Sequence, residues 1–276
     1  MHFSNIIFNY IFIYGWGPIP AMGVQGAGLG TALATAIGPI RYFYLGIKHS
    51  GKEGFLKSRP TLKELKKVIE LMVPASLQNF FFSMGLLTML FIVGKVGTLS
   101  LAAVNVILNI VLVALLLGIG LGLGASTLVG QAMGEKKIED AYRWGIEVSK
   151  LGLLIGVILG LPMILIPEYI LSVFLNDPLT IEIAKKPLML TGFGISFDMA
   201  GMVLMNALLG AGDNKSVMKI SLVTQWIFYL PLAYLIGPIL GKGLIGIWMA
   251  NFIYRSLQAG LFFRRFTKRE WQKIKI

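Results

Sequence analysis

The stretch GPIPAMGVQG at Gly17–Gly26 returns 220 positions later as GPILGKGLIG at Gly237–Gly246. Five positions are identical in the two copies: Gly17, Pro18, Ile19, Gly23 and Gly26 match Gly237, Pro238, Ile239, Gly243 and Gly246. Each copy joins two long apolar segments, so the pattern indicates an internal duplication. With a period of 220 residues, the counterpart of residues 71–217 would precede the first residue. We therefore expect a C-terminal piece of a longer duplicated protein, with one complete lobe and the end of its twin.

The composition is that of a membrane protein. Apolar residues make up 56% of the chain, charged residues 14%, and the mean hydropathy is +0.76. A soluble domain carries about 25% charged residues. Residues 99–134 and 220–241 contain no charged side chain, and runs of that length are typical of transmembrane helices. The sequence thus predicts an all-α, polytopic membrane protein with a six-helix bundle and a two-helix remnant of a related bundle.

Eight apolar helices are predicted, over residues 3–16, 27–47, 71–94, 99–131, 148–167, 187–210, 217–237 and 243–263. Nineteen Lys and Arg residues lie in alternate connections and in the C-terminal tail, whereas the other connections hold four. This excess marks the cytoplasmic side of a membrane. We expect a multi-pass protein of the inner (plasma) membrane with a cytoplasmic C-terminus. Although the net charge is +12, this distribution favours membrane lipid and not nucleic acid as the partner.

Four regions are expected along the chain. Residues 1–47 would form the last two helices of a truncated N-terminal lobe, and 48–70 a cytoplasmic linker. Residues 71–265 would form the complete six-helix lobe, and 266–276 a basic cytoplasmic tail. Within the linker, TLKELKKVIELM at 61–72 is amphipathic, which predicts either a short interfacial helix or the solvated first turns of the next helix.

Asp198 is the candidate for cation coupling. It is the carboxylate nearest the middle of a predicted span, where an aspartate costs about 2.5–3.5 kcal/mol and survives by pairing, protonation or hydration. A structural hydrogen bond is the alternative. Intramembrane polar, aromatic and methionine side chains are candidates for a substrate cavity, with packing as the alternative for each: Gln78, Asn79, Phe82, Asn105, Phe193, Phe197, Met202 and Gln225.

Several kinds of chemistry are disfavoured by what the sequence lacks. There is no cysteine, and the two histidines, His2 and His49, are far apart, which argues against a metal site and against a histidine-based catalytic triad. No G-x-x-x-x-G-K-[ST] loop occurs, which argues against ATP hydrolysis. We predict that the protein is not an enzyme, needs no cofactor and is a secondary transporter.

Four motifs resemble the multidrug and toxic compound extrusion (MATE) family, in the family's order. They are AMGVQGAGLGTALAT (21–35), VPASLQNFFFSMGLLTMLFIVGKVGTLSLAAVNV (73–106), GASTLVGQAMGEKK (124–137) and NALLGAGDNK (206–215). In the last, Leu209 stands where the family commonly has arginine. The resemblance covers essentially the whole chain.

The resemblance implies two six-helix bundles that export organic cations in exchange for protons or sodium ions, with a monomer as the full-length state. It also implies a cation-binding acid twelve residues before Gly210, which is Asp198. A glutamate that pairs with this acid in one branch would lie eight residues after Pro74, where this chain has Phe82. That departure disfavours sodium coordination and favours protonation of Asp198.

Two alternatives stay open beside multidrug efflux. A lipid-linked oligosaccharide flippase of the same superfamily would need cationic side chains in its cavity, but Arg41, Lys95 and Arg255 are expected towards helix ends. An inactive truncated fragment is the second alternative.

Overall fold

The computed structural model describes residues 2–50 and 61–274, and the regular structure of these residues is helical. The described residues contain no β-strand and one isolated bridge between Trp16 and Ile19. The chain divides into two compact units, Met1–Lys66 and Lys67–Ile276. The all-α prediction is confirmed, and the division falls within the expected linker 48–70.

The first unit contains a helical hairpin of α1 (His2–Tyr14) and α2 (Gly23–Ser50). The two helices pack closely because α2 presents glycines to α1: a Cβ at Gly26 would lie 2.2 Å from the carbonyl oxygen of Phe12. The turn between them is closed by backbone hydrogen bonds between Trp16 and Ile19.

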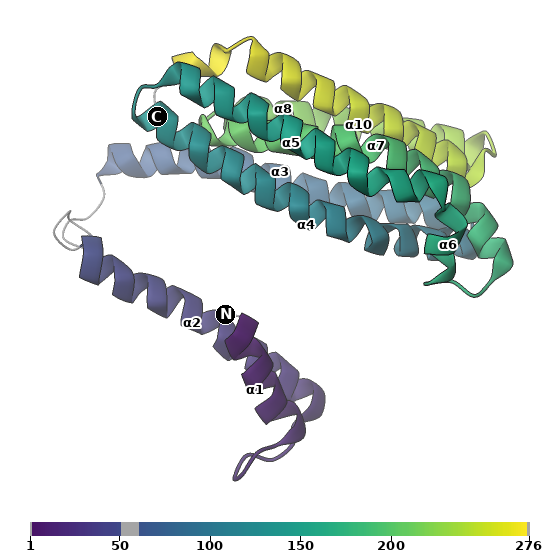
Figure 1. Ribbon diagram of the computed structural model, residues 1–276, viewed down its shortest axis with the longest axis horizontal. Coiled ribbons are helices and arrows are strands. Elements are labelled where there is room, and N and C mark those ends of the chain that lie inside the picture. Colours follow the sequence, from purple (N-terminus) through teal and green to yellow (C-terminus); the bar gives the residue numbers. More distant parts are fainter. Residues whose placement is uncertain (1, 51–60, 275–276) are drawn as a thin grey trace. The chain divides into compact units, whose positions relative to one another are not determined.

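The second unit is a bundle. Its elements, in chain order, are α3 (Leu62–Val96, whose first residues belong to the first unit), α4 (Thr98–Gly134), α5 (Ile138–Leu165), α6 (Pro167–Ser172), α7 (Pro178–Gly210), α8 (Asn214–Leu222), the π-helix η1 (Val223–Tyr229), α9 (Leu230–Tyr234), the π-helix η2 (Leu235–Ile239), α10 (Gly243–Thr267) and the 3-10 turn η3 (Glu270–Lys273). The segment from α8 to η2 forms one helical path that corresponds to a single predicted span. Figure 1 shows α4, α5, α7 and α10 running lengthwise beside one another.

The repeated sequence frame has the same structural role in both units. Gly23 has φ +54° and begins α2, and Gly243 has φ +61° and begins α10. Only glycine adopts this left-handed conformation without strain. Three residues later, Gly26 and Gly246 both contact the preceding helix, since a Cβ on Gly246 would lie 2.7 Å from Cγ2 of Ile236. The duplicated sequence thus builds the same helix start twice.

Helix α7 is the centre of the bundle and packs against α4, α5 and α10. Glycines of α5 that lie four residues apart make close contact with α7: a Cβ on Gly156 would lie 2.4 Å from Cα of Ser196, and one on Gly160 would lie 2.2 Å from the carbonyl oxygen of Gly192. Small residues allow helices to approach in this way. These glycines therefore serve the packing of α5 on α7.

Helix α3 begins earlier than the predicted residue 71. Thr61 and Glu64 form a reciprocal cap, in which the Thr61 amide donates to Oε2 of Glu64 at 2.7 Å and the Glu64 amide donates to Oγ1 of Thr61 at 3.3 Å. This capping box starts the helix at Leu62, and Pro74 lies within it. The amphipathic stretch 61–72 is therefore continuous with the apolar helix, as in the second of the two alternatives.

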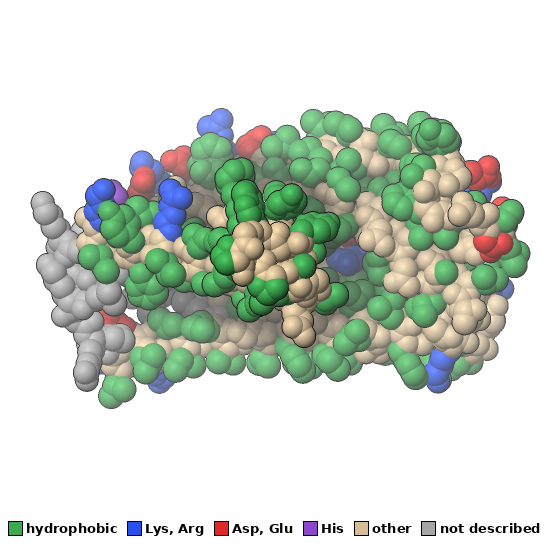
Figure 2. All heavy atoms as spheres, turned by 90° about the horizontal axis from the view of Figure 1, so that it is seen from below, with side chains coloured by type: hydrophobic (Ala, Val, Ile, Leu, Met, Phe, Trp, Pro, Cys, Tyr) green, Lys and Arg blue, Asp and Glu red, His purple; other side chains and the backbone are tan. Residues whose placement is uncertain are grey.

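Five helical segments are long and apolar enough to cross a membrane among the described residues: Leu62–Val96, Thr98–Gly134, Ile138–Leu165, Pro178–Gly210 and Asn214–Ile239. The sequence predicts eight spans. Helix α1 is shorter, with 13 residues, and α10 is made more polar by Asn251, Arg255 and Gln258 at its middle. Figure 2 shows hydrophobic side chains exposed over much of the visible face, which is typical of a surface in contact with lipid.

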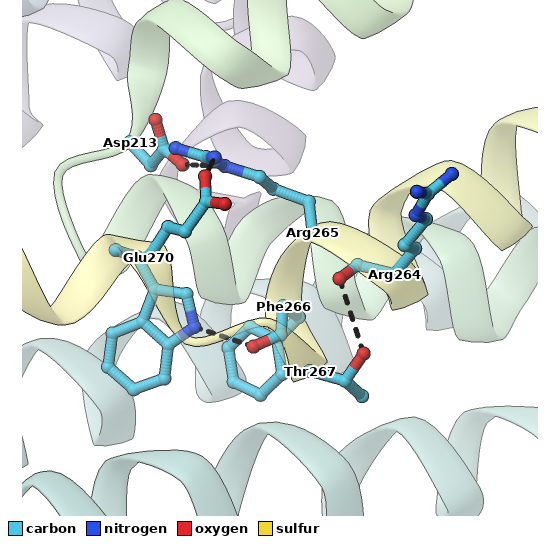
Figure 3. Close-up of polar contacts among 7 residues, drawn as sticks. Asp213, Arg264, Arg265, Phe266, Thr267 and Glu270 are labelled. Atoms are coloured by element: carbon cyan, nitrogen blue, oxygen red, sulfur yellow. Dashed lines mark hydrogen bonds and ion pairs between the residues drawn. The ribbon is translucent and has the colours of Figure 1, made fainter.

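The tail folds back on the bundle. Trp271 is fully buried, donates from Nε1 to the carbonyl oxygen of Phe266 at 2.8 Å and stacks on the Phe266 ring. Arg265 reaches from α10 to Asp213 in the α7–α8 turn and to Glu270 (Figure 3). The tail thus joins the ends of α7, α8 and α10.

Candidate functional site

Asp198 lies inside the bundle, on the face of α7 between its contacts with α4 and α10. Three residues on, Gly201 lies against Ala259 of α10, where an added Cβ would be 2.9 Å from the alanine Cβ. Four residues on, Met202 lies against Gly118 of α4, with Sδ 3.0 Å from the position of a Gly118 Cβ. Because residues three and four apart share a helix face, the Asp198 carboxylate points between α4 and α10. Its side chain is 33% exposed.

Arg255 of α10 is the charged partner of Asp198. Its Nε lies 3.9 Å from Oδ1 of Asp198, which is an ion pair but is too long for a hydrogen bond. The Nε atom is buried and has no hydrogen-bond partner among the described residues. The guanidinium lies over the ring of Tyr254, 5.4 Å from its centroid, and Tyr254 stacks on Tyr229 of η1 at 4.8 Å.

The pair lies where the two hydrophobic clusters of the bundle meet. On α7, Met199 belongs to one cluster and Val203 to the other. On α10, Tyr254 belongs to the first cluster and Phe262 to the second. Charged side chains between two apolar cores are unfavourable unless they pair with each other or are hydrated. This level of the bundle is therefore a candidate for function.

Polar side chains connect α3, η1 and α10 around this level. Gln258 donates to Oγ1 of Thr224 at 2.9 Å. Gln225, which is 7% exposed, donates to the carbonyl oxygen of Phe82 at 3.4 Å. Gln78 lies 3.2 Å from Sδ of Met205. These contacts place η1 between α3 and α10, and π-helical turns of this kind are frequent at functional sites.

The structure places the candidate cavity residues in two groups. Gln78, Met202 and Gln225 make the interhelical contacts described above and lie on inward faces with Asp198. The others are exposed on their helices: Asn79, Phe82, Asn105, Phe193 and Phe197. Asn105 donates to the carbonyl oxygen of Leu101 in its own helix, so its amide is already used locally.

Sequence reasoning missed Arg255. It was expected towards a helix end, but the structure places it at the middle of α10, twelve residues from both Gly243 and Thr267. The predicted bounds 243–263 already put it twelve residues from one end and eight from the other, so its position away from the helix ends could have been predicted. Its pairing with Asp198 was not readable, because it depends on how α10 packs against α7. Tyr229 and Tyr254 were missed because buried tyrosines carry no distinctive sequence pattern.

Other features of the described residues are less suited to a site. No group of three or more His, Asp or Glu residues is placed to hold a metal ion in the part of the chain that the structure describes. An open hollow of about 520 Å³ lies between α6 and the start of α7, but Glu168 in its lining is already paired with Lys185.

Fold and site together define a polytopic helical membrane protein with an ionisable pair inside its bundle. A family model described as MatE matches residues 74–235, and the chain belongs to this family. The family is one of transporters, in agreement with the prediction that the chain is not an enzyme.

Named relatives extend the match over nearly the whole chain. A "Probable multidrug resistance protein NorM" of Thermotoga maritima is 29% identical over 281 residues, covering 99% of this chain and 59% of that protein. A protein with the same description from Pasteurella multocida is 30% identical over 276 residues, covering 96% and 59%. The chain therefore spans about 59% of the length of the relatives that it matches.

Solved structures share the fold. An outward-facing multidrug resistance MATE family transporter of the MOP superfamily superposes with a TM-score of 0.82 at 18% identity, covering 96% of this chain and 59% of that one. A MOP superfamily transporter from Pyrococcus furiosus superposes with a TM-score of 0.79 at 19% identity, covering 96% and 60%.

Proposed function

We propose that this protein is a secondary transporter for multidrug efflux, which exports organic cations in exchange for protons or sodium ions by alternating access. The observation that carries the proposal is Asp198, a partly exposed carboxylate inside the bundle with no hydrogen-bond donor among the described side chains. A carboxylate in this state can take up a proton or a cation. The names of the relatives from Thermotoga maritima and Pasteurella multocida support the substrate class.

Transport in reconstituted vesicles tests this function. The purified 276-residue chain is placed in liposomes, and ethidium uptake is followed by fluorescence under an imposed proton gradient and, separately, a sodium gradient. We expect ethidium transport under one of the two gradients and its loss in Asp198→Asn. Glu147→Gln is the matched control, because it removes a carboxylate at the exposed surface of α5, where it pairs with Lys150.

The outcomes separate the hypotheses. Unchanged transport in Asp198→Asn would remove Asp198 from the mechanism. No ethidium transport by the unmodified chain under either gradient would favour the inactive-fragment alternative. The two gradients identify the coupling ion directly.

One observation on Arg255 supports the flippase alternative, and another argues against it. Arg255 lies at mid-helix, which a cationic cavity would require, but its charge faces Asp198 and the pair is neutral overall. Arg41 is exposed on α2. We therefore favour organic cations over pyrophosphate-linked lipids.

We further propose that the protein acts as a monomer in the inner membrane with its C-terminus in the cytoplasm. The chain has no cysteine, so single cysteines report topology cleanly. Lys242→Cys and Lys268→Cys mark the two exposed ends of α10. In intact cells we expect a membrane-impermeant maleimide to label Lys242→Cys and to spare Lys268→Cys; the reverse pattern would invert the topology. The mass of the protein–detergent complex, measured by light scattering, tests the monomer; a protein mass of two chains would contradict it.

A further inference from the structure

The Arg255 guanidinium is positioned by aromatic rings and has only a loose contact with Asp198. Its guanidinium lies on Tyr254, which is 2% exposed and stacks in turn on Tyr229, which is 3% exposed. These buried rings come from α10 and η1 and fix the position of the cation. An arginine over an aromatic face is attracted by the ring itself, so its place does not depend on Asp198 alone.

The contact with Asp198 lacks the geometry of a strong pair. Nε of Arg255 lies 3.9 Å from Oδ1, and no hydrogen bond joins the two side chains. A bidentate arginine–carboxylate pair has two hydrogen bonds of about 2.7–2.9 Å. The Nε–H of Arg255 is buried without an acceptor among the described residues, and such an unpaired donor is unfavourable. The loose ion pair between Arg255 and Asp198 can therefore be replaced by a pair between Asp198 and another cation without the loss of a hydrogen bond.

Both members of the pair are partly exposed. The side chains of Asp198 and Arg255 are each 33% exposed, although the Nε atom of Arg255 that faces the carboxylate is buried. An incoming cation can therefore reach the carboxylate, where it competes with a cation that the protein already supplies.

Resting on the proposed function, we propose that Arg255 is a tethered counter-ion of Asp198, with which a transported organic cation competes, and that it thereby sets the affinity of the site for such cations. Without substrate, the guanidinium neutralises the carboxylate between the two apolar clusters. When an organic cation reaches Asp198, its charge replaces that of Arg255, which keeps its contact with Tyr254. Arg255 is a specificity-determining residue in this scheme and need not touch the substrate.

Binding of tetraphenylphosphonium to the purified chain in detergent tests the proposal. Arg255→Gln removes the competing charge, and we expect its Kd to fall about twofold to fivefold, the range that a partly exposed ion pair supports. Arg255→Lys keeps the charge and should bind nearly as the unmodified chain does. Asp198→Asn should bind weakly with either glutamine or arginine at position 255. Arg264→Gln is the matched control, since it removes an exposed arginine from the same helix.

A measurement on the unmodified chain keeps the proposal testable if a variant does not fold. Nitrogen–proton NMR follows the Nε–H of Arg255 during a titration with tetraphenylphosphonium. The resonance is assigned by its loss in Arg255→Lys or, if that variant does not fold, by its contacts with nearby aromatic protons. We expect its resonance to shift, while that of Arg265, which is bonded to Asp213, stays in place.

The results distinguish this proposal from the one on which it rests. An unchanged or higher Kd in folded Arg255→Gln, or an unshifted Arg255 resonance while the chain binds tetraphenylphosphonium, would overturn the counter-ion role and leave cation transport standing. Failure of both the unmodified chain and Arg255→Gln to bind would overturn both.

Discussion

Arg265 donates from Nε to Oδ2 of Asp213 across 2.7 Å, and this bond fixes the end of α10 to the turn between α7 and α8 (Figure 3). The Asp213 side chain is 4% exposed and that of Arg265 is 25% exposed. The turn belongs to the NALLGAGDNK motif, and the arginine comes from the following hairpin. The pair thus links a sequence motif to a distant helix.

Removing Arg265 should weaken the bundle. We expect Arg265→Ala to lower the free energy of unfolding by about 1.5–3 kcal/mol, the contribution of a hydrogen bond to a charged group, because Asp213 loses its partner. Denaturant unfolding in detergent, followed by tryptophan fluorescence, measures it. Arg264→Ala is the control, since that neighbouring side chain is exposed; an equal loss there would assign the effect to net charge instead of to the pair.

Trp271 should be needed for the fold of the tail. Its side chain is fully buried against Phe266, so Trp271→Ala should reduce the free energy of unfolding by about 3–5 kcal/mol, as for other buried aromatic side chains. Trp144→Ala offers a comparison, because Trp144 is 45% exposed. If the two variants unfold at the same denaturant concentration, the packing of the tail contributes little to stability.

The α5–α7 contact should not tolerate a methyl group. A Cβ on Gly156 would lie 2.4 Å from backbone Cα of Ser196, so Gly156→Ala should destabilise the bundle by about 1–3 kcal/mol through overpacking. At Gly120 of α4 nothing lies within 4 Å of an added Cβ, and Gly120→Ala should be neutral or slightly stabilising. Thermal unfolding of both variants in detergent decides this, and equal midpoints would contradict the close contact.

Asp177 should make stability pH-dependent at the start of α7. Hydrogen bonds from the Thr180 side chain and backbone amide lower the pKa of the Asp177 carboxyl below its ordinary value of 3.8. A lowered pKa means that the contribution is fully present above pH 3.8 and is lost as the pH falls through the folded-state pKa. The melting temperature of Asp177→Ala should therefore lie below that of the unmodified chain near neutral pH and approach it in acid. Asp177→Asn, which keeps an uncharged cap, should lose less stability than Asp177→Ala at neutral pH, and its gap to the unmodified chain should also narrow in acid. A gap constant with pH in both variants would contradict the assignment.

Much of the helical architecture could be predicted because apolar periodicity and glycine placement are local properties. The start of α10 at Gly243 was predicted, whereas α2 begins at Gly23, four residues before the predicted 27; at both glycines the backbone has a positive φ, +54° at Gly23 and +61° at Gly243. Helix boundaries next to charged segments were less predictable. Helices α5 and α7 begin at Ile138 and Pro178, about ten residues before the predicted 148 and 187, because charged and proline-containing first turns also form helix.

The site was only half predictable. Asp198 stands out in sequence because a carboxylate at the middle of an apolar helix is expensive. Phe193 and Phe197 share that helix with Asp198, but both are about half exposed, at 54% and 48%. Which neighbours of a residue share its face depends on how the helix is rotated in the bundle, and that rotation is set by contacts such as Gly156 with Ser196.

The amino-acid order alone determined the helical class, the duplicated frame and the position of one intramembrane acid, since each is written in local composition and spacing. Tertiary packing decided that Asp198 faces Arg255, that Tyr254 and Tyr229 hold the guanidinium, and that Trp271 closes the end of the bundle. The physical reason is that charge pairing and side-chain burial depend on distances between helices, and these are fixed only when the glycine-lined faces of α4, α5 and α7 pack together and α10 packs on α7.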